Sequence, residues 1–218
     1  MGNLVPIAVV TGGHSFDVPG FHRLFHSIPG LDPYIQHMDD LFSSPPAVRA
    51  SYEAVVFYMM PIPTPHDEAM EWFMGRPTEA LQSLAVTGQG IVVLHHGLTA
   101  YREWDLWKSI TGLVRTSFSY HPGEKMTIEV ADPAHQITRG LQPWEMTDET
   151  YLMDDAGEGS RFLFSTSNAH SMRHVGWTRE FGKARVFCFQ PGHDARAWSS
   201  PEFREVLRRG ILWSAKRI

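Results

Sequence analysis

The sequence is poor in cysteine and has no long apolar run. One cysteine among 218 residues excludes an intrachain disulfide framework. No stretch approaches the roughly 20 apolar residues that a membrane-spanning helix needs, and the first residues lack the basic region of a secretory signal. We therefore expect a cytoplasmic protein with no membrane partner.

Positive charge is also scarce. The chain carries 19 lysines and arginines against 24 aspartates and glutamates, a net charge of −5, so it lacks the basic surface that binds nucleic acid. The compact metal-binding motif HExxH is absent as well. The lone Cys188 lies in the apolar run Arg185–Gln190, which is typical of an interior strand. We expect this cysteine to be a buried, small hydrophobic residue and not a nucleophile.

Histidine is the residue that the chain has in excess. The count of twelve histidines is the strongest indication in the composition that the protein has a catalytic or metal-binding site. An apolar fraction of 43% is sufficient for one hydrophobic core at this length. Because no repeat, linker or low-complexity segment interrupts the sequence, we expect a single domain over residues 1–218.

Short apolar runs alternate with helical periodicity through the first hundred residues. This alternation predicts a parallel sheet with helices on both faces. Strands are expected at residues 7–11, 34–38, 54–58 and 90–94, and helices after Asp17, within 66–87 and over 99–110. Later strands at 125–130, 161–166, 175–178 and 184–190 should extend this sheet or form an antiparallel edge on it, and a last helix should begin near Pro201.

The central strand ends in two imidazoles and a glycine, His95, His96 and Gly97. α/β enzymes use a sharp turn from strand to helix to present a reactive side chain above the sheet. Here that side chain is His95 or His96, where hydrolases and amidotransferases carry serine or cysteine.

Two other expected strands end in a similar way, at Gly12-Gly13-His14 and at Gly192-His193-Asp194. Glycine beside histidine lets the backbone turn tightly and lets a ligand approach closely. Ligands of open parallel sheets bind beyond the carboxyl ends of the strands. We therefore expect His14, His95 and His193 to meet in one pocket.

Three uses of such a pocket are consistent with the sequence. Imidazoles with a carboxylate could hold a divalent metal such as zinc. Histidines alone could carry out acid–base chemistry on a sugar hydroxyl or on a carbon beside a carbonyl. A binding protein without turnover could grip a polyol with Trp177 or Trp198. Asp148, Glu149 and Tyr151 follow no clear strand end, so they belong either to this site or to a solvated turn.

Several motifs, in their order along the chain, resemble the ThuA-like family, whose members are associated with trehalose utilisation. They span nearly the whole chain and are Val9–His14, Gly90–Gly97, Ile137–Leu141, Asp148–Tyr151, Gly182–Phe187, Gly192–Trp198, Pro201–Phe203 and Gly210–Trp213. The resemblance implies the class I glutamine-amidotransferase-like fold. This is an α/β fold of three layers, flavodoxin-like, with a mostly parallel sheet, helices on both faces and antiparallel strands added in the C-terminal half. The resemblance also implies a role in bacterial catabolism of sugars, glycosides or keto-sugars.

The wider superfamily places a nucleophilic cysteine at the strand-to-helix turn, in patterns such as Ile-Cys-His-Gly. This chain has His95 at the cysteine position, within Leu94–Gly97. Glutamine hydrolysis and cysteine proteolysis are therefore disfavoured. Cys188 cannot substitute, because it lies within a strand and not at its end.

Taken together, the residues and the resemblance predict an enzyme that acts on a small carbohydrate, as a hydrolase, lyase or isomerase. The expected catalytic residues are His95, His96, His14 and Glu149; the expected substrate-binding residues are Tyr151, Trp177, Gly13 and Gly97; the expected metal ligands are His14, His95 and His193. The alternative is a non-catalytic carbohydrate-binding or interaction protein on the same scaffold, and an amidohydrolase is a third reading. A homo-oligomer is compatible with the sequence.

Overall fold

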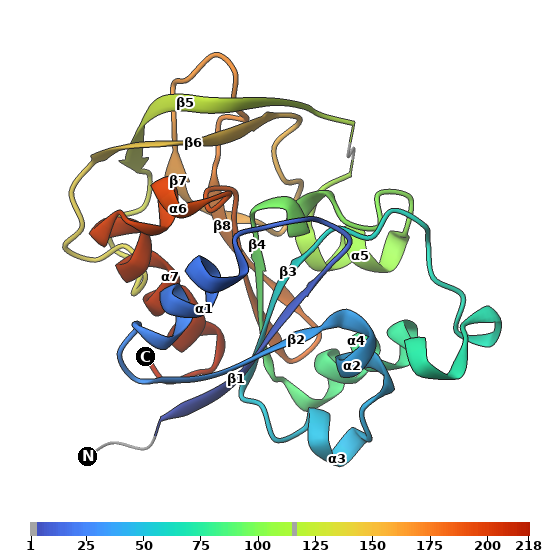
Figure 1. Cartoon of the computed structure of the whole chain (residues 1–218). Helices are drawn as coiled ribbons and strands as arrows, with labels where there is room; N and C mark the ends of the chain where they lie inside the picture. Colours follow the sequence, from blue (N-terminus) through green and yellow to red (C-terminus); the bar gives the residue numbers. More distant parts are fainter. Residues whose placement is uncertain (1–3, 115–116) are drawn as a thin grey trace.

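The computed structural model describes residues 4–114 and 117–218, and Figure 1 shows one twisted sheet with helices on both sides. Among these residues the sheet has nine strands in the order β2-β1-β3-β4-β9-β8-β7-β5-β6. Their bounds are β1 Val5–Gly12, β2 Leu31–His37, β3 Ala54–Met59, β4 Gly90–Leu94, β5 Ser119–Val130, β6 Trp144–Leu152, β7 Arg161–Ser165, β8 Gly176–Phe181 and β9 Ala184–Phe189.

The first half of the sheet is parallel and deeply buried. β2, β1, β3, β4 and β9 pair in parallel, and this order is the flavodoxin-like one. Every residue of β3 and β4 is buried, which is why these strands are continuous runs of apolar side chains without polar alternation. The predicted α/β fold class is confirmed.

Helices cover both faces of this sheet, as Figure 1 shows: α1, α6 and α7 on one side, and α2, α4 and α5 on the other. The helices are α1 Val18–His26, α2 Met38–Ser43, α3 Pro46–Arg49, α4 Pro77–Thr87, α5 Asp105–Thr111, α6 Ala195–Trp198 and α7 Pro201–Ser214. Asp17 and Ser200 begin α1 and α7 by accepting backbone N–H groups of Gly20 and Phe203 at 3.0 and 3.2 Å.

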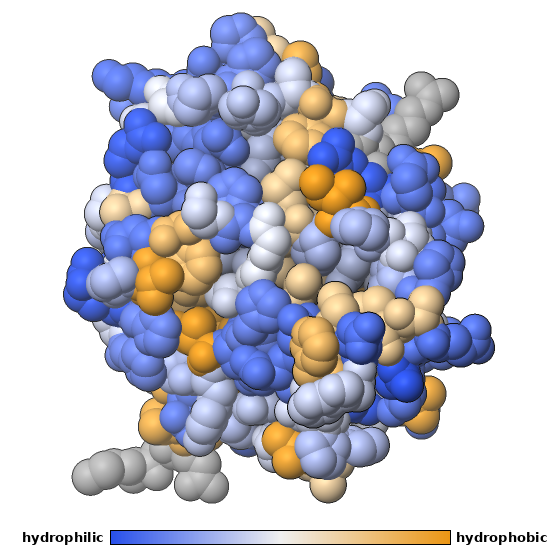
Figure 2. All heavy atoms as spheres, turned by 45° about the vertical axis from the view of Figure 1, so that its right-hand side comes forward, coloured by the Kyte–Doolittle hydropathy of each residue, from blue (hydrophilic) through white to orange (hydrophobic). Residues whose placement is uncertain are grey.

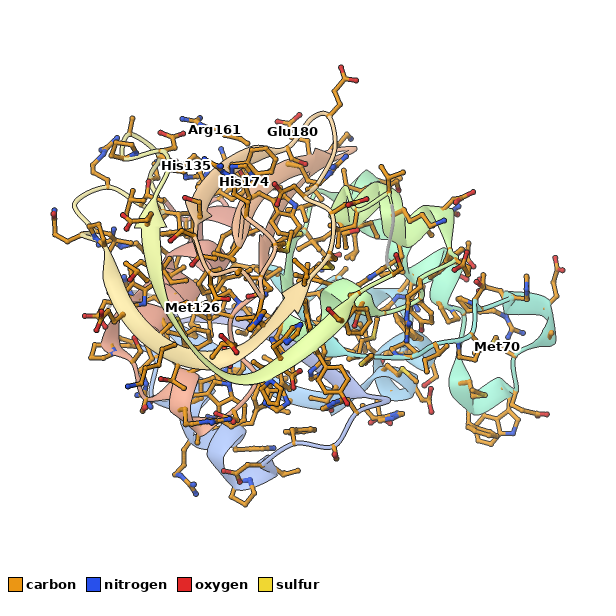
Figure 3. The ribbon with its side chains drawn as sticks, turned by 90° about the horizontal axis from the view of Figure 1, so that it is seen from above. Met70, Met126, His135, Arg161, His174 and Glu180 are labelled. Carbon is orange, nitrogen blue, oxygen red and sulfur yellow. The ribbon has the colours of Figure 1, made fainter. Side chains whose placement is uncertain are left out.

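The second half of the sheet is antiparallel. β8 pairs with β9 and with β7, while β5 meets β7 only through Glu129 and Val130. Most of β5 pairs instead with β6, and Figure 3 shows this two-stranded arm curving across the molecule, with Met126 on β5. The sequence pattern found only the end of β5 and no strand at 144–152.

The helices around the central strand also differ from the prediction. The helix expected over 99–110 is replaced by a 3-10 helix, η3 (His95–Thr99), a turn, and then α5. Tyr101 causes the break: its φ of +44° is incompatible with a right-handed helix, and its N–H donates to the carbonyl of Pro61 at 2.7 Å.

The region 66–87 is α-helical only from Pro77 onward. Two short 3-10 helices precede α4, η1 (Asp67–Ala69) and η2 (Trp72–Met74). Asp67 then accepts the N–H groups of Thr78 and Glu79 at 2.9 and 3.1 Å, which satisfies the first turn of α4.

The surface carries no extended apolar face in the view of Figure 2, where hydrophobic residues form separate patches among hydrophilic ones. Within residues 4–114 and 117–218, no helix is both long and apolar enough to cross a bilayer.

Candidate functional site

His95 lies at a sharp turn directly after β4 and is completely buried. Its φ of +49° places a non-glycine residue in the left-handed region, a strained conformation that concentrates at functional sites. Nδ1 lies 2.7 Å from the carbonyl oxygen of Gln190, which can only accept, so Nδ1 carries a hydrogen. In the neutral imidazole Nε2 then keeps its lone pair, and Tyr151 donates its O–H to it at 2.8 Å.

Glu149 and His193 complete a cluster around His95. Glu149 Oε1 lies 3.6 Å from His95 Nε2, and Oε2 lies 3.9 Å from His193 Nε2. One ligand atom from each of these three residues falls within 4.8 Å of the others, so the three side chains are near enough to converge on one metal ion. Among the described residues this set differs from the expected His14, His95 and His193, because Glu149 replaces His14.

His14 instead stacks on His96, with ring centroids 4.4 Å apart, and meets the ring of His193 edge-on at 6.0 Å. His96 is 1% exposed, lies 4.1 Å from the ring of Tyr58, and neither of its ring nitrogens has a hydrogen-bond partner among the described residues. Burial lowers the pKa of His96 well below its usual value, and the nearby His95 and His14 lower it further. Burial also lowers the pKa of His14, so both rings favour the neutral form.

The pKa of Glu149 shifts toward the ionised form. Burial by itself raises this pKa, but His95, His193 and Tyr151 lower it by more, and the net pKa lies below the usual value. Burial raises the pKa of Tyr151 well above its ordinary range, and Glu149 adds to the rise. Tyr151 is therefore a hydrogen-bond donor and Glu149 a carboxylate at neutral pH.

Asp148 ties the β5–β6 arm to the turn that carries His193. The side chain is fully buried; one oxygen accepts the N–H of Gly192 at 2.6 Å, and the other accepts the N–H groups of His193 and Glu149 at 3.1 and 2.9 Å. Burial raises the pKa of Asp148, while His95 and the three N–H groups act in the opposite direction. From the sequence, Asp148 belonged either to this site or to a solvated turn; its buried side chain lies at the site and has a structural role.

Two side chains from outside this turn hold its backbone: Tyr58, which the sequence did not indicate, and Trp198, named above as a candidate polyol contact and here buried. Trp198 donates its indole N–H to the carbonyl of Gly192 at 2.8 Å, and Tyr58 donates its O–H to the carbonyl of His193 at 2.9 Å. Tyr58 lies near the end of an expected strand, which is the one signal that could have pointed to it. The carbonyl of Gln190 carries no signal in the sequence, since a backbone acceptor is independent of residue type.

Trp177 and Gly97 do not belong to the site, so their expected substrate-binding roles are corrected. Trp177 is fully buried and donates its N–H to the carbonyl of Thr111 at 2.8 Å. Gly97 is buried against β3, where a Cβ would lie 2.5 Å from the carbonyl oxygen of Phe57. Both residues serve packing, as does Cys188, which is fully buried and whose thiol pKa is raised by that burial.

Gly13 does lie at the carboxyl edge, exposed and with a φ of +74°. A Cβ on Gly13 would come 2.7 Å from the backbone of Met60, so the turn bearing His14 needs glycine to pass this close to β3.

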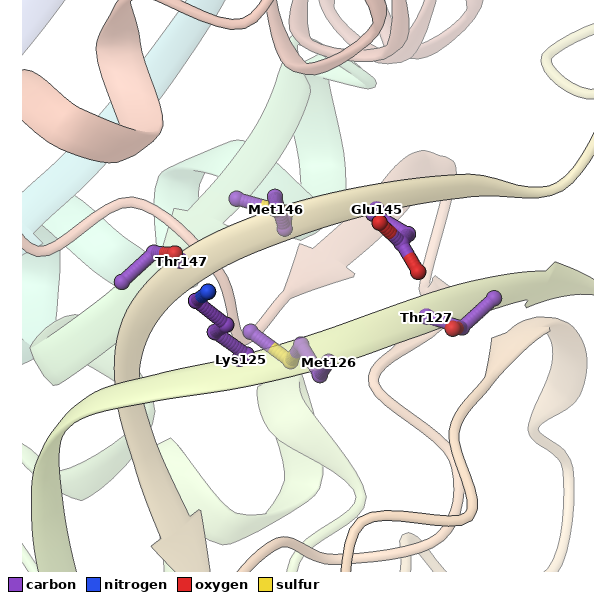
Figure 4. A pocket seen from close by; sticks show the side chains of 6 residues that line it. All are labelled: Lys125, Met126, Thr127, Glu145, Met146 and Thr147. Atoms are coloured by element: carbon purple, nitrogen blue, oxygen red, sulfur yellow. The ribbon is translucent and has the colours of Figure 1, made fainter.

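A shallow depression on the β5–β6 arm is separate from the cluster. Figure 4 shows its walls, Lys125, Thr127, Glu145 and Thr147 with Met126 and Met146. The depression measures about 240 Å³, and no histidine lines it. The histidines therefore remain the candidate site.

Comparisons with known proteins agree with this fold. The model of the family ThuA, described as trehalose utilisation, matches residues 36–214. A ThuA-like protein from Parabacteroides merdae has a TM-score of 0.75 at 19% identity, covering 99% of this chain and 91% of its own. A cytoplasmic protein from Salmonella typhimurium has a TM-score of 0.68 at 10% identity, with coverages of 95% and 98%. No curated protein matches the sequence significantly.

The fold likeness extends to amidotransferases. A glutamine amidotransferase from Thermotoga maritima has a TM-score of 0.57 at 9% identity, and the match covers 99% of this chain and 100% of that one. At such identities the likeness concerns the fold alone.

Proposed function

Because the chain belongs to the ThuA family of trehalose utilisation, we propose that it is an enzyme of sugar or glycoside catabolism, with keto-sugars among its substrates. The proposal rests on one observation above all. His95 is held in a strained turn with its Nδ1–H anchored, so that Nε2 faces Tyr151 and Glu149.

The same anchoring suits a metal ligand. Metal-binding histidines commonly donate their second N–H to a backbone carbonyl, which fixes the ring and its tautomer. His95 makes this bond to Gln190, and the donor set of His95, Glu149 and His193 has the nitrogen and oxygen atoms that zinc accepts. An ion held there would take the Nε2 lone pair in place of the Tyr151 O–H, polarise a sugar oxygen and leave coordination positions open for substrate.

The same cluster offers acid–base groups, with Glu149 acting either as a ligand or, where it holds no ion, as a base. Glu149, ionised at neutral pH, would accept a proton from a sugar hydroxyl or from a carbon beside a carbonyl. Tyr151 would donate a hydrogen bond to the sugar oxygen on which charge develops. The neutral rings of His14 and His96 would provide polar contacts without adding positive charge. The substrate is a small carbohydrate, and the protein works in the cytoplasm.

A panel of disaccharides and 3-keto-glycosides, assayed with and without added zinc, tests the proposal. We expect turnover of at least one member, and His95→Ala should lower kcat/KM by about 1,000-fold. His26→Ala is the matched control, since His26 is an exposed histidine on α1. Zinc bound per chain, measured on protein purified without nickel resin or chelator, should fall in His95→Ala and Glu149→Gln but not in the control.

Two other outcomes would contradict the proposal that the chain is a sugar-processing enzyme. Sugar binding with no turnover of any substrate would identify a non-catalytic carbohydrate-binding protein on this scaffold. Hydrolysis of glutamine would show amidotransferase chemistry, which the histidine at the cysteine position of the turn disfavours.

A further inference from the structure

An apolar groove lies at the same edge of the sheet as the histidines. Three methionines, Met38, Met70 and Met74, line it together with Phe42, Tyr101 and prolines that include Pro61. Its volume is about 140 Å³. The proposed acid–base chemistry uses none of these side chains.

The groove is placed where open α/β sheets bind their ligands. β1 is flanked by β2 and β3, so the strand order reverses beside it, and ligands bind beyond the carboxyl ends at such a point. Met38 directly follows β2, and Pro61 comes two residues after the last residue of β3. The turn that carries His14 packs on the same strand end, because Gly13 lies against the backbone of Met60 and Pro61.

The walls of the groove are preformed. Tyr101 adopts a φ of +44° and is fixed by its N–H bond to Pro61 at 2.7 Å, and its ring packs edge-on to Trp104 at 5.1 Å. The proline-rich segment 61–65 has little conformational freedom to lose when a ligand binds. A preformed apolar groove favours a ligand over a purely structural gap.

The size of the groove selects its occupant. An apolar cavity of about 150 Å³ holds a benzene molecule, so this groove accommodates one six-membered ring and is too small for a peptide helix. Asp39, Thr64 and Tyr101 are the residues of its lining with polar side-chain groups, too few to satisfy all the hydroxyls of a sugar. The ring must therefore be apolar.

We propose that this groove binds the apolar ring of a glycoside whose sugar lies among the histidines. The inference rests on the proposed function for the position of the sugar. It makes the substrates of this chain glycosides of small apolar alcohols or phenols and not only disaccharides.

A matched pair of probes tests the groove directly: phenyl β-glucopyranoside and methyl β-glucopyranoside, titrated by calorimetry or NMR. We expect the phenyl glycoside to bind at least about tenfold more tightly, because only its ring removes apolar surface from water in the groove. Met70→Trp should fill the groove and abolish the preference, and Met74→Lys should do the same by placing a charge there. Met70 lies in the outer loop labelled in Figure 3, and both methionines are only partly buried, so these variants are expected to fold.

Trp72→Ala is the control, since Trp72 is 84% exposed in η2 and does not line the groove. Equal affinity for the two glycosides would overturn the inference, as would a phenyl preference that survives in both methionine variants. If instead the proposed function is wrong, His95→Ala will leave turnover and zinc binding unchanged, whether or not the phenyl glycoside binds more tightly.

Discussion

The two halves of the sheet contribute different chemistry to the candidate site. The parallel half supplies the imidazoles, since His14, His95 and His193 follow β1, β4 and β9. The antiparallel arm supplies oxygen groups, Glu149 and Tyr151 on β6. The cluster takes its carboxylate, Glu149, from the arm and its imidazoles, His95 and His193, from the parallel half, so it depends on how firmly the arm is attached.

The strand pairing that attaches the arm is narrow. Among the described residues β6 pairs with β5 alone, and β5 pairs with β7 through Glu129 and Val130. Asp148 joins the arm to the turn after β9, and Tyr151 joins it to His95. Changes at these two residues test how much each link contributes while every histidine side chain is retained.

The largest effect is expected for Asp148→Asn. The amide replaces one acceptor with a donor that faces a backbone N–H, so we expect a loss of about 3 kcal/mol in the free energy of unfolding. Zinc affinity should fall with it, because Glu149 and His193 lose their common support. Urea denaturation and calorimetry measure the two quantities. Glu145→Gln, an exposed change on the same strand, is the control. A variant with unchanged zinc affinity would show that the arm is held by other contacts.

A smaller effect is expected for Tyr151→Phe. The ring can keep its stacking on His95, 4.8 Å between centroids, while the O–H bond to Nε2 is lost. We expect kcat to fall about tenfold, with zinc affinity and unfolding free energy nearly unchanged. Tyr120→Phe provides the comparison, since Tyr120 is paired with Tyr151 across the arm but is 64% exposed. Equal loss in both variants would refute a specific role for the Tyr151 hydroxyl.

The smallest effect is expected on the pH dependence of stability, and it comes from His96 in the parallel half. The pKa of His96 lies well below 6.5 in the folded chain, so below pH 6.5 the unfolded chain binds a proton that the folded chain does not. Stability present above pH 6.5 should therefore be lost as the pH falls, by up to about 1.4 kcal/mol per pH unit. Melting temperatures in the presence of chelator measure the slope. His96→Phe should reduce it, and an unchanged slope would place its origin elsewhere.

The two halves also differ in how well the sequence predicts them. Buried parallel strands are continuous apolar runs, so the positions of β1, β3, β4 and β9 and the histidines after them could be found from residue types. The arm is half exposed, and β6 carries Asp148, Glu149 and Thr150 as buried polar residues in mid-strand. Such residues resemble a turn until the partners that satisfy them are known, which explains why β6 was missed.

The site residues follow the same division. The turn at His95 was evident from the abrupt end of the strand, whereas the replacement of His14 by Glu149 in the candidate metal-binding set depends on distances between segments far apart in sequence. Trp177 was misjudged because an aromatic side chain in a strand has the same pattern whether it faces a ligand or the core.

The position of β9 has a consequence for how the polypeptide acquires its structure. β9, the last strand in the sequence, lies in the middle of the sheet between β4 and β8. Among the described residues it is the only strand that hydrogen-bonds to both halves of the sheet. A nascent chain that has not yet released residues 184–189 from the ribosome can pair the strands of each half but lacks the strand that hydrogen-bonds to both. Acquisition of the native sheet therefore includes an insertion step rather than growth at an edge, and late long-range closure of this kind makes folding slow.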